Sequence, residues 1–276
     1  MGLNAIDAAR RAVSPIAVIA TLPETVPELR SITRRAGMTG WEGELVRRAG
    51  DVSLDRAGTV LPWWPGHVVR RVLATGRSRL SSHSFVSEYE AMSVGVAERV
   101  LGRFAHVEAL AADLEWLVDH CDPRSRPQLS DALRRPRPTS PAARSHVLAL
   151  ALHRFREDCL LRGAERAGVT DALGVMLLRH LVDPRSDDPR LYGWSERDVA
   201  AAAETLPSDG DAEGMWRAVE TEADALAADP WESMTESRRT RALGVIEAAA
   251  DTAVALPGAS PLSQASETNS RRSSLQ

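Results

Sequence analysis

Histidine and acidic residues recur at helical spacing in two segments of the chain, and we begin with the chemistry that this pattern could support. The residues concerned are His106, Asp113 and His120 in the first segment, and His146, His153 and Glu157 in the second. Residues seven positions apart lie on the same face of an α-helix, so each set forms a stripe. Two facing stripes of imidazole and carboxylate groups could bind a divalent metal ion between neighbouring helices.

The sequence therefore offers four candidate metal ligands: His120, His146, His153 and Glu157. Neither segment contains the Glu-x-x-His pair of the di-iron sites in helical bundles, so the likeness is one of residue type and spacing. The alternative interpretation is that these side chains are structural, as in most clusters without a recognised motif. A divalent metal ion is the only cofactor that the pattern indicates, and no catalytic residue can be named.

Composition excludes several classes of chemistry. All 34 basic residues are arginine, which excludes a lysine Schiff base, a lysine general base and a Walker-type phosphate lysine. Cys121 and Cys159 fall inside helical patterns without paired spacing, so we expect buried thiols rather than a disulfide or a zinc site. No apolar run approaches the roughly 20 residues that cross a bilayer. The sequence thus predicts a cytoplasmic protein with no membrane partner.

Charge is unevenly distributed along the chain, whose net charge is −4. Region 196–251 holds 14 acidic residues and five arginines, whereas region 124–144 holds six arginines and one acidic residue. We expect the basic segment to pair with acidic groups of the same protein. Because the chain is acidic overall and no aromatic residues are interleaved with these arginines, the sequence argues against nucleic acid as a partner.

The elements that must position these residues are predicted to be helices. Hydrophobic residues make up 43% of the chain and aromatic residues only 4%, with Ala, Leu and Val dominant. The clearest helix begins with Ser140 as N-cap and Pro141 at its first position, and its apolar residues occupy two sides. We predict an all-α fold, an irregular multi-helix assembly around a central helix near 141–167, with a small β-hairpin near 52–61.

Composition divides the chain into four regions. An N-terminal helical region is predicted over 1–122, a Pro- and Arg-rich connecting loop over 123–141, and a C-terminal helical region over 142–256. Residues 257–276 are rich in serine and poor in large apolar side chains, so a disordered tail is expected. The pattern leaves open whether the helical regions form one domain or two.

One short motif invites comparison with a known family. Residues Pro62-Trp63-Trp64-Pro65 have the letters of the motif that names the PWWP domains. The resemblance implies a small β-barrel whose aromatic cage binds methylated lysine through cation–π attraction. Residues 70–90, which follow, lack the further strands and aromatic residues of such a barrel. We therefore interpret the two Trp side chains as anchors of a loop on the helical core.

Two classes of function follow from these observations. The first is a cytoplasmic helical adaptor or regulatory protein that acts through protein–protein interaction, with the acidic C-terminal half as its docking face for a protein partner. The alternative is an all-α enzyme of specialised metabolism, with an apolar pocket for a small molecule and a His/carboxylate metal site. A third interpretation, ranked below both, is nucleic-acid binding through the arginine-rich segment, which would weaken steeply with salt.

Overall fold

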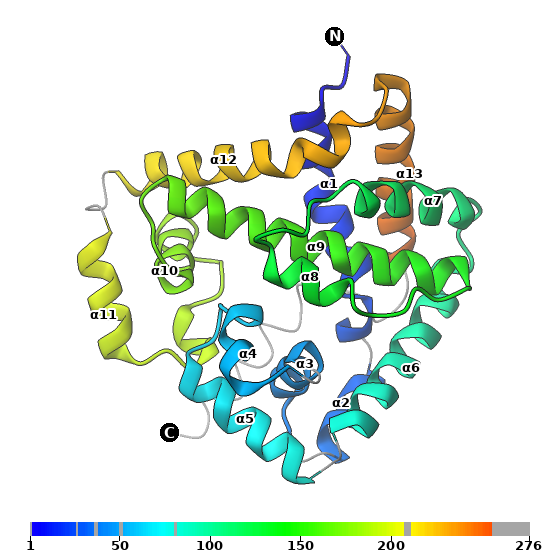
Figure 1. Ribbon diagram of the computed structural model, residues 1–276. Helices are drawn as coiled ribbons and strands as arrows, with labels where there is room; N and C mark the ends of the chain where they lie inside the picture. Colours follow the sequence, from blue (N-terminus) through cyan, green and yellow to red (C-terminus); the bar gives the residue numbers. More distant parts are fainter. Residues whose placement is uncertain are drawn as a thin grey trace.

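The computed structural model describes residues 2–25, 27–35, 38–49, 52–79, 82–206 and 211–255, and within these ranges it contains helices and no β-strand (Figure 1). The elements are α1 (Ala5–Ala20), η1 (Leu22–Thr25), α2 (Pro27–Arg35), α3 (Gly40–Ala49), α4 (Leu54–Val60), α5 (Gly66–Arg79), α6 (Ser82–Leu101), α7 (Val107–Asp119), α8 (Pro127–Ala132), α9 (Pro141–Arg166), α10 (Ala172–Val182), η2 (Pro189–Tyr192), α11 (Glu196–Thr205), α12 (Ala212–Glu232) and α13 (Glu236–Val254). The predicted all-α fold is confirmed, and the tail predicted at 257–276 lies outside the described residues. None of the described helices combines the length and hydropathy needed to cross a lipid bilayer.

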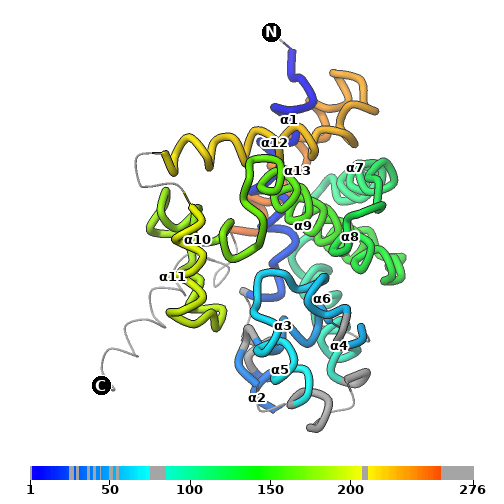
Figure 2. Tube along the Cα trace, turned by 60° about the vertical axis from the view of Figure 1, so that its left-hand side comes forward, coloured from blue at the N-terminus to red at the C-terminus, as the bar shows by residue number. Residues whose placement is uncertain are grey.

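Helix α9 runs through the middle of the molecule (Figures 1 and 2). It contacts α1, α6, α7, α8 and α12. Leu148 and Leu150, which point to different sides of α9, are both buried. Pro141 occupies the first turn, where its missing N–H leaves no intrahelical hydrogen bond unmade. The predicted central helix near 141–167 is therefore confirmed.

A buried carboxylate fixes α1 and α12 to α9. Asp224 on α12 is 3% exposed and accepts a hydrogen bond from Nε of Arg10 on α1 at 2.7 Å. Nη2 of Arg156 on α9 lies 2.7 Å from the other oxygen of Asp224. Two guanidinium groups thus compensate the desolvation of this carboxylate.

Helices α3, α4 and α5, which we call the three-helix unit, all contact one another and lie at the opposite end of the molecule from α12 (Figures 1 and 2). Their buried side chains belong to a hydrophobic core distinct from the one that surrounds α1 and α13. Leu45 of α3, Ala57 of α4 and Leu73 of α5 are each at most 1% exposed. The three helices therefore share one apolar core, to which residues of α6 and α10 also contribute.

The β-hairpin predicted near 52–61 is wrong, because this segment contains helix α4. Thr59 and Val60 of this segment are β-branched, a residue type that is enriched in strands. The buried positions Ala57, Val60 and Leu61 are instead three and four residues apart, which is the period of an amphipathic helix. Packing of this face on α5 outweighs the local preference of the β-branched residues.

The segment predicted as a connecting loop at 123–141 contains the short helix α8. Asp158 of α9 lies at the start of α8, where its carboxylate accepts the backbone N–H of Leu129 at 2.9 Å. Burial raises the pKa of Asp158 to about 6, although this hydrogen bond acts in the opposite direction. The contact attaches the segment to the central helix.

Both cysteines are buried and unpaired with each other, as predicted. Burial raises the pKa of Cys159 to about 12 and raises the pKa of Cys121 as well. The thiol is therefore the stable form at neutral pH, and both residues act as core side chains.

Candidate nucleic-acid interface

Helices α4 and α5 are joined by a short turn, and α3 packs against both. Within the turn, the N–H of Trp64 donates to the carbonyl of Leu61 at 3.3 Å. The N–H of Val68 then donates to the carbonyl of Pro65 at 2.9 Å, so α5 begins directly after the turn. Two helices joined by a short turn and supported by a third have the layout of the helix-turn-helix motif.

Helix α5 has one buried face and one exposed face. Its buried residues, each at most 2% exposed, are Val68, Val69, Val72 and Leu73. Among residues 66–74, the part of α5 whose exposure is described, the exposed residues are Gly66, His67, Arg70, Arg71 and Ala74. Exposed pairs at 66–67 and 70–71 alternate with buried pairs at 68–69 and 72–73, as in an amphipathic helix. The helix is thus anchored by its valine-rich face and presents a basic face outward.

The exposed face of α5 belongs to a basic part of the chain. The helix contains four arginines and no acidic residue. Region 27–79 contains ten arginines and five acidic residues, whereas the whole chain carries a net charge of −4. Arg70 and Arg71 form no ion pair with any described residue. Their charge is therefore available to an anionic partner.

Four aromatic residues, which we call the aromatic clasp, tie the α4–α5 turn to the linker between α10 and α11. Trp64 packs on Tyr192, with ring centroids 5.4 Å apart. Nε1 of Trp194 donates to the carbonyl of Trp63 at 3.0 Å. Trp63 and Trp64 are 9% and 7% exposed, which confirms the interpretation of this pair as loop anchors. The clasp fixes the entry into α5 from the side of α10 and α11.

Gly193, between the two clasp residues of the linker, touches the first turn of α5. Its φ is +91°, in the left-handed region that favours glycine. A Cβ atom at this position would lie only 2.8 Å from Cγ2 of Val68. The linker backbone can approach α5 this closely because residue 193 has no side chain.

Helices α10 and α11 form a second pair of helices joined by a linker, at the left of Figure 1. A capping box starts α11: Ser195 Oγ accepts the N–H of Asp198 at 3.1 Å, and the Asp198 carboxylate accepts the N–H of Ser195 at 3.2 Å. The three-residue spacing of Ser195 and Asp198 is the one that a capping box requires. The sequence of α11 contains three acidic residues and one arginine, and none of its residues is buried. The nearby Arg190 already pairs with Asp188 and Glu196. The charge of α11 is thus unfavourable for contact with phosphates.

Of the four candidate metal ligands, the structure brings together only His153 and Glu157, whose Nε2 and Oε1 atoms are 3.8 Å apart. Nη1 of Arg154 donates to the other Glu157 oxygen at 2.7 Å, and Nη2 of Arg48 lies 3.7 Å from Oε1. Burial acts to raise the pKa of Glu157, but the charges of Arg154 and Arg48 lower it to about 2. The carboxylate is therefore ionised and already surrounded by cations.

The other two candidates lie apart from this pair. His120 is exposed and stacks on Trp116, with ring centroids 4.3 Å apart. His146 is buried, with its Nδ1 3.0 Å from the carbonyl oxygen of Ile19. Within the described ranges, no three His, Cys, Asp or Glu side chains gather as a metal ion would require. Metal binding at these four residues stays a prediction from the sequence.

A depression between α1, α9 and α12 is the place that the enzyme alternative would use. It has a volume of about 370 Å³, counted together with the open solvent above it, and its lining includes Ile16, His153 and Trp231. Only one of the four candidate residues reaches it. Catalysis there likewise stays a prediction from the sequence.

The arginine-rich connecting segment makes the internal ion pairs that we expected. Arg137 donates to Glu115 at 2.9 Å and to Asp119 at 2.6 Å, both on α7, and these bonds raise its pKa. Arg126 is 5% exposed and lies 3.6 Å from Asp229 of the acidic C-terminal region. The segment still exposes Arg124 and Arg134, whereas α5 exposes two adjacent arginines on one face of a helix that has no acidic residue.

The basic face of α5 was missed at the level of sequence. The signal lies in residues 68–73, whose sequence is Val-Val-Arg-Arg-Val-Leu. Apolar pairs four residues apart, separated by a basic pair without any acidic residue, are typical of a half-buried basic helix.

Comparison with known protein families shows that residues 7–260 match the model of a helix-turn-helix family. Neither the comparison with curated proteins nor that with solved structures gives a match. The family match contradicts our sequence-based argument against nucleic acid as a partner, because the helix-turn-helix is a DNA-binding motif. The overall charge and the connecting segment do not reveal the four arginines of α5. Since the match spans most of its length, this chain belongs to the helix-turn-helix family.

Proposed function

We propose that this protein is a DNA-binding regulatory protein that places α5 in the major groove of duplex DNA. The observation that carries the proposal is the basic, half-exposed helix at the second position of a helix-turn-helix layout. Membership of a helix-turn-helix family supports the same conclusion. The expected docking face is formed by His67, Arg70 and Arg71.

The dimensions of α5 are compatible with this role. Its 14 residues correspond to about 21 Å of helix, and the major groove, about 12 Å wide, admits an α-helix. His67, Arg70 and Arg71 lie in its N-terminal half, which is the part of a recognition helix that contacts base edges. Arginine can bind a guanine edge or a backbone phosphate with two parallel hydrogen bonds.

The charge distribution also defines which side of the protein faces DNA. Region 196–251 carries 14 acidic residues and would be repelled by phosphates. We therefore expect the basic face of α5, and not region 196–251, to approach DNA. Binding of this kind weakens steeply as the salt concentration rises, because each neutralised phosphate releases counterions.

The test is fluorescence anisotropy of the full chain with a duplex selected by the protein from a random-sequence pool. In the R70Q/R71Q variant we expect affinity to fall at least tenfold, and the salt dependence to lose about two phosphate contacts. The matched control is R217Q, which removes an exposed arginine from α12. Equal affinity and equal salt slope for R70Q/R71Q and the wild type would contradict the proposal, provided that circular dichroism shows both to be folded.

A separate observation supports a second function, as an adaptor for a protein partner. Helix α11 has no buried residue and exposes Glu196 and Glu204, so it offers an acidic docking face. We expect wild-type protein, used as bait in a lysate of its host, to capture a partner that the E196Q/E204Q variant does not. Capture of the same proteins by both forms would count against this function.

A further inference from the structure

One sequence pattern occurs twice in the chain. Arg-Ala-Gly-x-Thr-x-x-x-Gly is found at residues 35–43 and again at residues 166–174. The arginine that opens each pattern is the last residue of a helix, Arg35 of α2 and Arg166 of α9. Each pattern then leads into the next helix, α3 or α10. The pattern thus joins two helices in the same way at two places in the fold.

The two places also share a backbone hydrogen bond. The N–H of Met38 donates to the carbonyl of Thr33 at 2.8 Å, and the N–H of Val169 donates to the carbonyl of Ala164 at 2.8 Å. In each pair the donor follows the glycine of Arg-Ala-Gly, and the acceptor stands two residues before the arginine. Met38 and Val169 are both buried. The chain therefore leaves the first helix with the same geometry in both places.

The glycine that closes each pattern has the same packing role. A Cβ atom at Gly43 would overlap Cγ2 of Thr33, and a Cβ atom at Gly174 would lie 3.0 Å from Cγ1 of Val169. In both places the missing side chain lets a helix approach the segment that precedes it. The recurrence of glycine at this position therefore has a structural cause.

The correspondence extends through the following helices. Trp64 and Trp194 each stand two residues before the start of a helix, α5 or α11. Five residues after either tryptophan is a valine, whose N–H donates to the carbonyl of the residue next to the tryptophan, at 3.1 Å in α5 and 3.0 Å in α11. Helix α6 then contacts α2 and α3, as α12 contacts α9 and α10, while η2 takes the place of α4. We call residues 29–101 the first repeat and residues 160–232 the second repeat.

The two repeats meet through the aromatic clasp. Trp64 of the first repeat packs on Tyr192, which lies just before Trp194 in the second. Trp194 in turn donates to the carbonyl of Trp63, which lies just before Trp64 in the first. Such reciprocal contacts are typical of the two-fold interface between identical subunits. The single chain therefore contains within itself the kind of interface that two separate copies of one unit would form.

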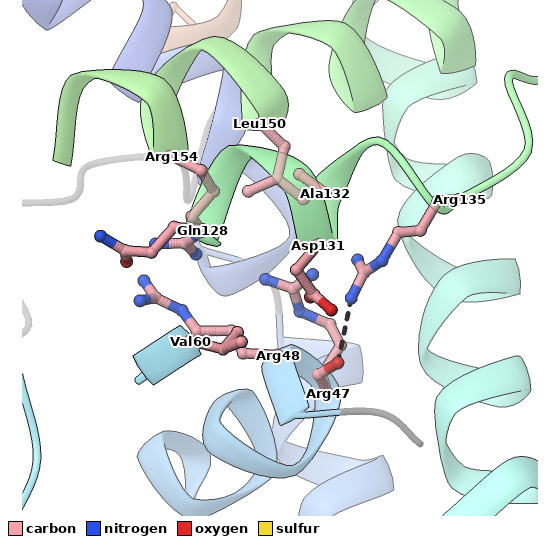
Figure 3. Close-up of a pocket in the computed structure, with 9 residues that line it drawn as sticks. All are labelled: Arg47, Arg48, Val60, Gln128, Asp131, Ala132, Arg135, Leu150 and Arg154. Carbon is pink, nitrogen blue, oxygen red and sulfur yellow. Dashed lines mark hydrogen bonds between the residues drawn. The ribbon is translucent and has the colours of Figure 1, made fainter. Parts of the chain in front are cut away.

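The repeats differ in the charge of their helices. The positions of Arg70 and Arg71 in α5 are occupied in α11 by Ala200 and Ala201, and α11 has three acidic residues and one arginine. The difference extends to the preceding helix. Arg47 of α3, whose carbonyl accepts Nη2 of Arg135 at 3.0 Å (Figure 3), corresponds to the fully buried Leu178 of α10. Only the first repeat therefore presents a basic second helix.

We infer that the chain contains two copies of one helix-turn-helix unit and binds DNA as a single chain, at a site without two-fold symmetry. The DNA part of this inference rests on the proposed function. Dimeric helix-turn-helix proteins place two equivalent helices on two half-sites, so their DNA sites are palindromic. Here the equivalent of α5 is the acidic α11, which phosphates repel. The turn that a second chain would need for symmetric docking is already covered, since Trp63 and Trp64 are 9% and 7% exposed.

The symmetry and the stoichiometry of the DNA complex test the inference. Duplexes selected by the full chain from a random-sequence pool should share one motif without an inverted repeat. Sedimentation velocity with such a duplex should show one chain per duplex. Two inverted half-sites about 10 base pairs apart, occupied by two chains, would overturn the inference and leave the proposed function standing. Absence of binding to any duplex would refute the proposed function, and the DNA part of the inference with it.

A mixing experiment gives an independent measure. An excess of R70Q/R71Q added to the wild type should leave the anisotropy titration of the wild type unchanged, because each chain binds alone. The matched control is an excess of R217Q, which keeps α5 intact and should bind alongside the wild type. If two chains shared one site, mixed pairs would form, and the excess of R70Q/R71Q would lower the binding of the wild type. That result would overturn the inference.

Discussion

The α4–α5 and α10–α11 pairs have similar layouts and opposite charges. In each pair a helix with buried apolar residues is followed by a linker and by a helix with an exposed face. The second helix of the first pair carries four arginines and no acidic residue, whereas that of the second pair carries three acidic residues and one arginine. Helix-turn-helix geometry alone therefore does not identify a DNA-contacting helix, and charge has to distinguish the two.

The pairs also differ in how firmly their second helix is attached. Helix α5 buries four apolar side chains, while α11 buries none. A helix that must hold arginines in register with base edges needs rigid support. Helix α11 is instead suited to support its neighbour, because the linker that precedes it forms half of the aromatic clasp.

Replacement of Trp64 by alanine should have the largest effect, because this ring connects the α4–α5 pair to the α10–α11 pair. Trp64 is 7% exposed and contacts Tyr192 and Arg48. Truncation of a buried Trp costs about 3–5 kcal/mol of folding free energy. We expect chemical denaturation to show this loss, together with a weaker affinity for DNA because α5 loses its support.

The control for this variant is W116A. Trp116 is half-buried and stacks on His120 at the surface of α7, far from the clasp. Its removal should lower stability less than removal of Trp64 and leave DNA affinity unchanged. If W64A kept wild-type DNA affinity, the two pairs would be independent and the clasp would not position α5.

Charge reversal should have the next largest effect, and it tests directly whether α5 or α11 contacts DNA. We expect R70E/R71E to weaken DNA binding by about a hundredfold or more at moderate salt, because two attractive contacts become repulsive. The reciprocal variant E196R/E204R on α11 should change affinity only slightly. Anisotropy with the selected duplex measures both, and a larger change for the α11 variant would exchange the roles of the two helices.

Much of the fold could be predicted from sequence because its signals are local. Ser140 and Pro141 mark the start of α9, and the apolar residues on two of its sides predict a covered helix. The capping spacing of Ser195 and Asp198 likewise predicts the start of α11. Helix α4 could not be predicted in this way, since only its burial against α5 decides between strand and helix.

The candidate site could be predicted far less well, because it depends on contacts between distant segments. Spacing places His146 and His153 on one stripe of a helix. It does not show that His146 lies against Ile19, or that Arg48 lies near Glu157, the acidic residue beside His153. The approach of Gly193 to Val68 joins residues more than a hundred positions apart. Such contacts leave no periodic signal in a single sequence.

Substitution of Gly193 by alanine should have an intermediate effect. Both the positive φ and the clash with Val68 oppose a side chain here. The matched control is G168A, because Gly168 has a similar φ of +89° but nothing within 4 Å of its would-be Cβ atom. We expect about 1 kcal/mol of destabilisation in the control, from backbone strain alone, and about 1–3 kcal/mol more in G193A. Equal melting curves for the two variants would show that the close approach does not constrain α5.

Removal of the cap of α11 should have the smallest effect and should be confined to that pair. S195A deletes the capping hydroxyl and is expected to cost about 1 kcal/mol of local stability, seen as faster amide hydrogen exchange in α11. Its counterpart S53A at the start of α4 should change exchange little, because Ser53 makes no capping hydrogen bond through its side chain.

The stability that this cap contributes to α11 should fall at acidic pH. Hydrogen bonds from the Ser195 hydroxyl and N–H lower the pKa of Asp198 in the folded protein. This contribution is therefore complete above the ordinary carboxyl pKa and is lost as the pH falls through the lowered value. We expect acidification to reduce the protection of amide hydrogens in α11 but not in α5. We also expect S195A to keep its DNA affinity at neutral pH. Both results would fit a supporting role for α11. A fall in DNA affinity in S195A would instead mean that the acidic helix takes part in recognition, and the contrast between the two pairs would have to be abandoned.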